Sequence, residues 1–485
     1  MKIPTETQVG ELLTSTLIVV DDAHASEERL MAEIAAFSEL LPITLQSEKL
    51  RVELSCSERI WRLIRAVLEV KVADNEQKTL KVRLVRGVIV LGRNLLSVDR
   101  QQAEKLQIRQ HVFAFANYLE ELNVEESVEM NTLTSVFQLV ANMSMNQKRH
   151  NTEALDEVVT LFQRANEHHV WTEQVLHPAF AYVDNLFSDT DVLYLALSKG
   201  EGKPLLGVAL KEFESLNIEQ DLTRYGTLIV GIFTKLVLHE SFLKFITTYN
   251  TPEDTLRYLK VAEAIITSRT NWEVFELTVV LSWNFELFQK TLVEAQHYFE
   301  SKATDEPKFI YGKIFSVMDV LSTLSHLEHT RKFLLSYHGV ELLVSLLGTI
   351  HKNVKPKSKL KDQENTKDKV ADIKNFPHIK SMVIETLTSL VHANFEVQEL
   401  IRETHGLPVI LSCCIIDDNE PFIKERAIVC LRFLLKDNQK NQDFVAKLEA
   451  KEVIPNEDLD DIGFEVEIID GKVQMKKKPK VEEIN

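Results

Sequence analysis

Apolar residues recur along most of the chain at the three- and four-residue spacings of an amphipathic helix. The first strong example is the apolar stripe Ile60, Leu63, Ile64, Val67 and Leu68. Ser57 stands ahead of this stripe, in the position of a helix N-cap. Comparable segments follow with short polar joints, and no run in this part of the chain keeps the two-residue period of a strand for long. The pattern therefore predicts an all-α chain.

Prolines set the boundaries of two expected helices. The helix that begins at Glu28 is expected to end before Pro42. The run at 199–204 resembles a phosphate-binding loop, but no strand is predicted before it, and Pro204 stands where such a loop needs Ser or Thr. We therefore expect a turn, with Pro204 at the first position of the next helix.

Two helices carry side chains that could also serve a site. The segment from Trp272 to Phe299 is aromatic, and we expect its rings to form core rather than a ligand groove. The helix expected from Leu80 to Leu96 carries the densest basic run of the N-terminal half: Lys81, Arg83, Arg86 and Arg93. This run is either a patch for an acidic partner or, more simply, a solvated helix face.

A repeated pattern becomes visible in the last third of the chain. The run Leu321, Leu324 and His326 matches Leu387, Leu390 and His392, and each run leads to a short helix that ends at a glycine, Gly339 or Gly406. The two glycines are 67 positions apart, and removing the Lys-rich segment 352–375 leaves about 43. A third copy follows 44 positions later, where Leu431 matches Leu387. This period lies in the armadillo and HEAT range of about 40 to 47 residues. The sequence therefore predicts an armadillo/HEAT-like α-solenoid superhelix with a concave face free for partners.

The same reading divides the chain into four parts. Armadillo-like helical repeats are expected over residues 1–350 and a flexible Lys-rich insert over 351–375. A C-terminal armadillo-like domain is expected over 376–455, and a disordered charged tail over 456–485.

Composition narrows the function classes. The 485 residues include only 14 glycines and 12 prolines, which favours long helices over turn-rich folds. The net charge of −17 argues against a nucleic-acid partner, because phosphate contacts need a basic face. We therefore expect protein partners and no nucleic acid.

The number of cysteines and the length of the apolar runs indicate the cellular compartment in which the protein is expected. The four cysteines are too few for a disulfide framework, so a reducing compartment is expected. The apolar stretch from Leu12 to Val20 resembles a secretion signal, but Asp21 and Asp22 precede the supposed cleavage point. No apolar run approaches the roughly 20 residues that span a bilayer. We expect a soluble, cytoplasmic protein without membrane insertion.

The stretch from about Phe376 to Lys451 resembles the C-terminal domain of the ataxin-10 family. The residues that carry the resemblance are Gly406-Leu407-Pro408, Asp417-Asp418-Asn419-Glu420-Pro421-Phe422, Glu425, Ile428, Leu431-Arg432 and Asp437-Asn438-Gln439-Lys440-Asn441-Gln442-Asp443. The fungal members, some of which carry the name copper transport protein 86, are the most similar in our interpretation. The resemblance implies an armadillo-like fold, support of cell growth and survival, and regulation of cytokinesis through partners.

Structural roles account for the residues of this family motif. Asp417 or Asp418 is expected to cap a turn, Pro421 to lie near a helix start, and Phe422 to staple the next helix. Glu425 and Arg432 are expected to be solvated charges. The remaining motif residues taken as structural are Gly406, Pro408, Asn438, Asn441 and Gln442. Where the family commonly shows Leu-Arg-Asn-Leu, this chain has Phe433 in place of the Asn, which puts peptide capture by that residue in doubt.

No pattern for catalysis or metal binding is found. Adjacent residues of a helix point about 100° apart, so Cys413 and Cys414 are poorly placed to share one ion, and Cys430 lies on another helix. Buried apolar cysteines are the simpler interpretation. No carboxylate or cysteine at metal spacing accompanies the histidines His168, His169, His326, His329 and His338. We therefore expect no metal, no cofactor and no catalytic residues.

The sequence thus favours a non-enzymatic, protein-binding scaffold. The alternative is a transport or import adaptor that carries a peptide cargo or is linked to copper homeostasis. An import adaptor should show Trp and Asn at regular spacing on successive helices, whereas the four tryptophans are irregularly spaced at Trp61, Trp171, Trp272 and Trp283. The partner is not named by the sequence, and homo-oligomerisation stays open.

Overall fold

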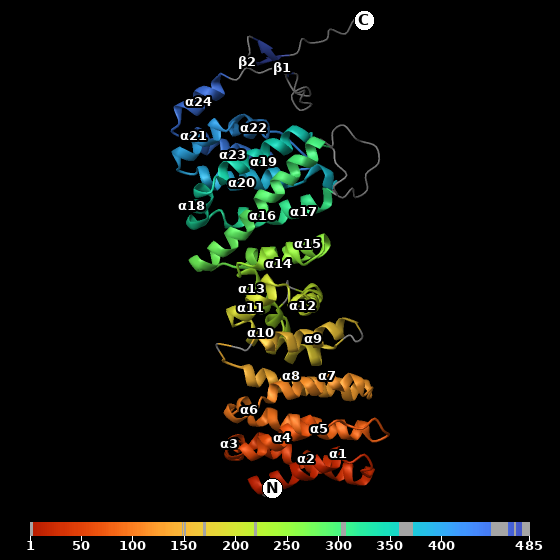
Figure 1. The fold of residues 1–485 in the computed structure, drawn as a ribbon. Coiled ribbons are helices and arrows are strands. Elements are labelled where there is room, and N and C mark those ends of the chain that lie inside the picture. The colour runs from red at the N-terminus through yellow and green to blue at the C-terminus, as the bar shows by residue number, and fades with distance from the viewer. Residues whose placement is uncertain are drawn as a thin grey trace. The chain divides into compact units, whose positions relative to one another are not determined.

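The computed structural model describes all residues except 1–2, 148, 150–151, 168–170, 218–220, 302–306, 358–371, 448–463, 470–471 and 478–485 (Figure 1). The chain forms two compact units, which divide between Arg269 and Thr270. Unit 1 covers residues 1–269 and unit 2 covers residues 270–485. The expected boundary at residue 350 is wrong, because α19 (Gly339–Asn353) packs against both α20 (Ile379–Val391) and α22 (Gly406–Ser412) within unit 2. The insert therefore interrupts a stack of repeats, and its residues 358–371 lie outside the described part.

Unit 1 is a stack of helical layers (Figure 1). Its helices are α1 (Glu6–Asp21), α2 (Glu27–Gln46), α3 (Glu48–Ser55), α4 (Glu58–Glu69), α5 (Lys78–Leu95), α6 (Gln101–Lys105), α7 (Ile108–Glu121), α8 (Glu126–Ser144), α9 (Glu153–Glu167), α10 (Glu173–Leu186), α11 (Thr190–Ser198), α12 (Lys203–Ser215), α13 (Arg224–Val237), α14 (Phe242–Thr248) and α15 (Pro252–Ser268). The predicted cap is confirmed, since Ser57 Oγ accepts the backbone N–H of Ile60 at 3.3 Å. Pro204 is the second residue of α12, one position later than expected.

Within this stack, α2, α5, α8, α10 and α13 form a row in which each helix contacts the next. Asn94 Nδ2 donates to Thr44 Oγ1 at 2.9 Å and joins α5 to α2. Asn185 Nδ2 donates to Ser144 Oγ at 3.0 Å and joins α10 to α8. Aromatic rings fill the space behind the row, where Trp171 lies 5.4 Å from Phe137 between ring centroids. Each layer thus buries its apolar stripe against its neighbours.

One helix boundary differs from the sequence prediction, because α2 continues through Pro42 to Gln46. Proline costs helix stability because its ring removes the bond to the carbonyl four residues earlier. Here that residue, Ser38, is exposed, so water can satisfy its carbonyl. Buried Leu40 and Thr44 on either side anchor the helix to the core.

Unit 2 contains the repeat that the sequence predicts, in the form of successive sets of three helices. Its elements are α16 (Val274–Ser301), α17 (Pro307–Leu324), α18 (Glu328–Ser336), α19, the 3₁₀ turn η2 (Ile373–Asn375), α20, α21 (Phe395–Glu403), α22, α23 (Ile423–Leu435), α24 (Gln439–Ala446), and the strands β1 (Phe464–Ile469) and β2 (Lys472–Lys477). The equivalent leucines Leu321, Leu387 and Leu431 are all buried. Together with the packing of α17 on α20 and α20 on α23, this confirms the all-α, armadillo/HEAT-like solenoid fold.

The two repeat glycines begin equivalent helices. A residue in the left-handed conformation precedes each: His338 (φ 58°) before Gly339 and His405 (φ 61°) before Gly406. A Cβ on Gly339 would lie 2.9 Å from the Leu334 carbonyl oxygen, so the chain can turn this tightly only with glycine.

The expectation of a disordered tail is wrong for β1 and β2. These strands pair antiparallel, with Phe464 opposite Lys477 and Ile469 opposite Lys472. The residues between them in the sequence are Asp470-Gly471, a pair typical of two-residue hairpins.

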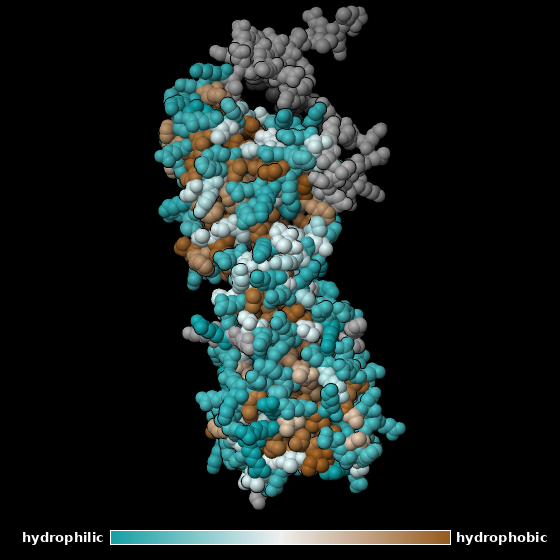
Figure 2. Space-filling view, in the orientation of Figure 1, coloured by the Kyte–Doolittle hydropathy of each residue, from teal (hydrophilic) through white to brown (hydrophobic). Residues whose placement is uncertain are grey.

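The surfaces of the two units are mixed. Figure 2 shows hydrophilic side chains over most of the visible face of unit 1, with apolar patches between them. The aromatic stripe of α16 is mostly core, as expected, with Trp283, Phe285 and Phe288 buried, but Phe275 is 75% exposed. Among the described residues, no single helix has the length and apolarity to cross a bilayer, and only the pair α18 and α19, bent by 81°, meets those requirements jointly.

Candidate functional site

The acidic turn of the family motif, residues 417–422, packs against the N-terminus of α20. Asp417 Oδ2 lies 2.8 Å from Lys380 Nζ, and neither side chain is more than 2% exposed. Asp417 Oδ1 also accepts the backbone N–H groups of Asn419 at 3.0 Å and Lys357 at 3.1 Å. Asp417 therefore caps the turn, as the sequence predicts, and also fixes the segment that follows α19. The partner Lys380 was not predicted.

Glu420 supplies the missing cap of α20. Its carboxylate oxygens accept the backbone N–H groups of Lys380 and Ser381, each at 3.0 Å. These N–H groups have no partner inside the helix, and a carboxylate at a helix N-terminus also interacts favourably with the helix dipole. Burial nevertheless raises the pKa of Glu420 to about 7, against the opposing effect of these hydrogen bonds.

Asp418, Pro421 and Phe422 of the turn lie at the surface, whereas Asn419 is buried. Phe422 has φ 63° and is 72% exposed, so the predicted staple on the next helix is wrong. The left-handed backbone at this position is combined with a side chain that lies in solvent. Pro421 stands two residues before α23, and Glu425 and Arg432 are exposed, in agreement with their predicted roles, while Asp418 is exposed and leaves the cap of the turn to Asp417.

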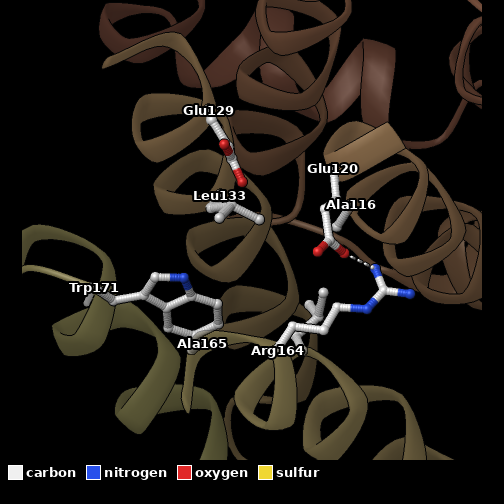
Figure 3. Close-up of a pocket in the computed structure, with 8 residues that line it drawn as sticks. Ala116, Glu120, Glu129, Leu133, Arg164, Ala165 and Trp171 are labelled. Carbon is white, nitrogen blue, oxygen red and sulfur yellow. Dashed lines mark ion pairs between the residues drawn. The ribbon is translucent and has the colours of Figure 1, made fainter. Parts of the chain in front are cut away.

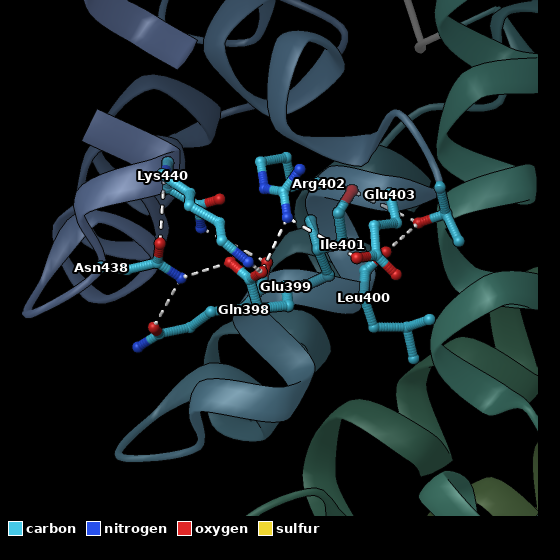
Figure 4. A network of polar contacts seen from close by, with 10 residues as sticks. Gln398, Glu399, Leu400, Ile401, Arg402, Glu403, Asn438 and Lys440 are labelled. Carbon is cyan, nitrogen blue, oxygen red and sulfur yellow. Dashed lines mark hydrogen bonds and ion pairs between the residues drawn. The ribbon is translucent and has the colours of Figure 1, made fainter. Parts of the chain in front are cut away.

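A second polar network joins α21 to α24 (Figure 4). Asn438 caps α24 by accepting the N–H of Asn441 at 3.0 Å, and its own amide donates to Glu399 at 3.1 Å. Asn441 Nδ2 donates to the Leu434 carbonyl at 2.9 Å, and Gln442 Nε2 donates to the Leu435 carbonyl at 2.7 Å. The three motif amides are therefore structural, as predicted.

Glu399 is the ionic centre of this network. Its Oε2 accepts from Lys440 at 2.9 Å and from Arg402 at 2.7 Å. The hydrogen bond from Lys440, supported by those from Asn438 and Arg402, lowers the pKa of Glu399 to about 2. Figure 4 shows that these donors converge on the one carboxylate. No sequence pattern singled out this residue.

Two recesses open on unit 1. The smaller, about 20 Å³, has room for a water molecule and lies between Trp171 and the ion pair of Arg164 with Glu120, 3.0 Å apart (Figure 3). The larger, about 280 Å³, is lined by polar side chains that include Gln107, Gln110, Gln147 and Arg109. Glu157 pairs with Arg109 at 2.9 Å and neutralises its charge.

The side of the row formed by α5, α8 and α10 that faces solvent is polar. We call it the polar row face and define it by Arg83, Arg86, Arg93, Asn131, Gln138, Asn142, Gln174 and Asn185, all half-buried or exposed. Gln174 Nε2 donates to Asn131 Oδ1 at 3.0 Å, and the Arg93 guanidinium donates to Gln138 Oε1. These amides link neighbouring helices and still present donors and acceptors to solvent.

Charge on this face comes from α5. Burial lowers the pKa of Arg86 and of Arg93, and in each case a neighbouring arginine lowers it further. Lys81, the fourth cation of the predicted basic run, does not belong to the face: it is buried, and its Nζ donates to the Asp22 carbonyl at 2.7 Å. The solvated-face interpretation is therefore wrong for Lys81.

Comparison with known proteins identifies the family. A family model described as the spinocerebellar ataxia type 10 protein domain matches residues 379–476. An ataxin-10 homolog of Debaryomyces hansenii is 33% identical over 475 residues, which cover 95% of this chain and 94% of that protein. The chain belongs to the ataxin-10 family. The ataxin-10 homolog of Saccharomyces cerevisiae is 29% identical over 88% of each chain, and human ataxin-10 is 29% identical over 38% of this chain and 39% of its own.

The family likeness is wider than the residues that first suggested it. The predicted resemblance covered residues 376 to 451, whereas the fungal ataxin-10 relatives match nearly the whole chain. The matched domain includes α20 to α24 and both strands up to residue 476. Among solved structures, that of SYS-1 is 11% identical with a TM-score of 0.33, and covers 88% of this chain and 75% of its own.

Burial acts on three of the four cysteines. Burial raises the pKa of Cys413 and of Cys430 to about 12 and also raises that of Cys414. The thiolate is the form that binds metal, and burial disfavours this form in all three side chains. No group of three or more histidine, cysteine or carboxylate residues close enough to hold a metal is found in the described ranges.

Proposed function

We propose that this member of the ataxin-10 family is a non-enzymatic, protein-binding scaffold that acts in the cytoplasm. The polar row face carries the proposal. Stacked helical layers bury their apolar stripes against one another. The side of the row that no other helix covers is then the surface at which such a fold can bind a partner. The amides of Asn131, Gln138 and Gln174 offer hydrogen bonds there without a catalytic group beside them. The cysteines are free thiols, which fits a reducing compartment.

The family resemblance suggests where such a scaffold acts. Support of cell growth and survival, and regulation of cytokinesis, are the roles it implies. Both would require the chain to hold other proteins together. We therefore expect a reproducible set of protein partners rather than a small-molecule substrate.

Affinity purification tests this proposal. The tagged full-length chain is expressed at its natural level in the organism of origin, and co-purifying proteins are identified by mass spectrometry. An unrelated helical-repeat protein of similar size and net charge serves as the control. We expect partners that are enriched only with this chain and that include proteins of the division machinery. Absence of any reproducible partner, together with turnover of a metabolite by the purified chain, would refute the scaffold.

A transport adaptor that carries a peptide cargo is the second candidate. The amides of the polar row face favour it, because side-chain amides can bind the main chain of an extended peptide. An adaptor releases its cargo at a destination, whereas a scaffold stays with its partners. Imaging of the purified partners in cells depleted of this chain separates the two, because only loss of an adaptor moves its cargo to another compartment.

A further inference from the structure

The solvent-facing stripe of α5 contains three arginines. Its positions are Arg83, Arg86, Val90 and Arg93, which follow the spacing of one helix face. The positions between them, such as Val85 and Ile89, are buried. At 1.5 Å per residue the stripe from Arg83 to Arg93 is about 15 Å long.

The charge of this stripe is not balanced inside the chain. None of the three arginines forms an ion pair with another described residue, although the chain carries a net charge of −17. Arg86 makes no side-chain hydrogen bond within the described part, and Arg93 uses the neutral amides of Asn94 and Gln138. One arginine elsewhere in unit 1 that does have an acidic partner is Arg257, which binds the Glu214 carboxylate through two bonds of 2.7 and 2.6 Å.

Arg86 and Arg93 are half-buried, so their unpaired charges carry a cost in solvation free energy. A guanidinium that loses part of its hydration is stabilised only when a carboxylate or another acceptor replaces the water. Burial and the neighbouring like charge both lower the pKa of Arg86, and no carboxylate opposes them. A carboxylate brought in by a partner would relieve both effects. Arginine is suited to this because its planar fork binds a carboxylate through two hydrogen bonds.

Beyond α5, the residues that define the polar row face add no negative charge. On α8 and α10 the polar row face consists of amides, among them Asn131, Asn142 and Gln174. Asp184 of α10 is already paired with Lys235, with the two atoms 2.6 Å apart. A ligand bound at α5 would therefore contact three arginines, and beyond them the neutral amide donors and acceptors of α8 and α10.

We propose that the arginine stripe of α5 binds a short acidic segment of a partner protein. An extended segment of about five residues spans the 15 Å of the stripe, so two or three carboxylates within it can each reach an arginine. The neighbouring amides would bind its main chain. A protein segment fits better than a nucleic acid, because the net charge of −17 repels a long polyanion. This inference rests on the proposed scaffold function and names the chemistry of one partner.

The test uses the full chain and a ten-residue peptide of alternating Glu and Gly with a fluorescent label, whose binding is measured by fluorescence anisotropy at low salt. In the first variant, R83Q/R86Q, Arg93 keeps its bonds to the neighbouring helix. The second variant is R83Q/R86Q/R93Q. The control R62Q/R65Q removes two arginines of α4 that are paired with Glu58 and Glu69. Circular dichroism melting checks that each variant is folded.

We expect the double variant to raise the dissociation constant of the peptide about fivefold and the triple variant at least tenfold, with less than a twofold change in the control. We also expect added salt to weaken binding to the wild-type chain more than binding to the triple variant. Failure of the wild-type chain to bind the peptide, or equal losses in the double variant and the control, would overturn the inference. Tighter binding of a ten-nucleotide DNA through the same arginines would overturn it in favour of a nucleic acid.

Affinity purification with the triple variant separates this inference from the proposed function. If all partners of the wild-type chain are retained, the arginine stripe is not a partner site and the scaffold stands. If the peptide binds through the arginines but the wild-type chain has no partner in cells, the scaffold fails while the stripe retains its chemistry. We expect loss of a subset of partners, each with an acidic segment.

Discussion

Lys380 Nζ lies 2.8 Å from Asp417 Oδ2, and the two side chains are only 2% and 1% exposed. The pair joins the start of α20 to the turn before α23. Charges removed from water cost several kcal/mol each, and their mutual attraction offsets this cost only while both are present. Removing one partner of this pair should therefore destabilise the turn that carries the family motif more than replacing both partners with apolar residues.

The substitution Asp417→Ala should destabilise the α20–α23 layer. It leaves the Lys380 ammonium buried without a partner, which costs about 3–5 kcal/mol. Hydrogen exchange of the amides of α20 and α23 measures the loss. Asp418→Ala is the control because Asp418 is exposed. Lys380→Met combined with Asp417→Leu should recover most of the loss, and equal exchange in Asp417→Ala and Asp418→Ala would contradict the prediction.

Glu420 should make the same layer less stable as pH rises. Its pKa is raised from the ordinary 4.5 to about 7 by burial. Between these values the folded state binds a proton that the unfolded state has released, so stability is full below about pH 4.5 and falls by on the order of 3 kcal/mol up to pH 7. In Glu420→Gln this fall should be absent. Exchange protection of α20 from pH 4.5 to 8 in both proteins is the measurement, and parallel profiles would contradict the assignment.

Glu399 should act in the opposite direction, since its pKa is lowered to about 2 chiefly by the hydrogen bond from Lys440. Its contribution is present above the unfolded pKa near 4.5 and is lost as pH falls toward 2. Glu399→Gln should therefore reduce the protection of α24 amides at pH 7, with a difference from wild type that shrinks below pH 4.5. Glu403→Gln, at a side chain 63% exposed on the same helix, is the matched control. A difference that does not depend on pH would point to packing instead.

The features that the sequence predicted are local ones. Amphipathic spacing, the cap at Ser57 and the repeat glycines Gly339 and Gly406 each depend on residues within a few turns of one another, so their pattern can be read along the chain. The same holds for the amides Asn438 and Asn441, which cap or join adjacent helices. Pro42 is the exception, because tertiary anchoring on both sides of it overrides its helix-breaking tendency.

The features that were missed depend on pairs distant in sequence. Lys380 meets Asp417 across 37 positions, and Glu420 caps a helix 40 positions before it. No pattern of residues within a few helical turns predicts pairs this far apart in the sequence. The exposed side chain of Phe422 was missed for a related reason, since a left-handed backbone at a bulky residue is uncommon and has no sequence signal. Nor does the unbalanced charge of Arg86 show in the sequence, because carboxylates are abundant there and only the fold shows that no described carboxylate pairs with it.

The close packing at Gly406 provides a last prediction with an internal control. A Cβ at this position would lie 2.9 Å from Val344 Cγ2 and 3.0 Å from Ile401 Cγ2, and both of these side chains are buried. Gly406→Ala should therefore destabilise unit 2 by about 1–3 kcal/mol through overpacking. Gly348→Ala lies in α19 with no atom within 4 Å of the added Cβ, and should stabilise the helix by about 0.5–1 kcal/mol. Urea denaturation followed by circular dichroism compares the two, and shifts of the same sign would show that helix propensity rather than packing decides at Gly406.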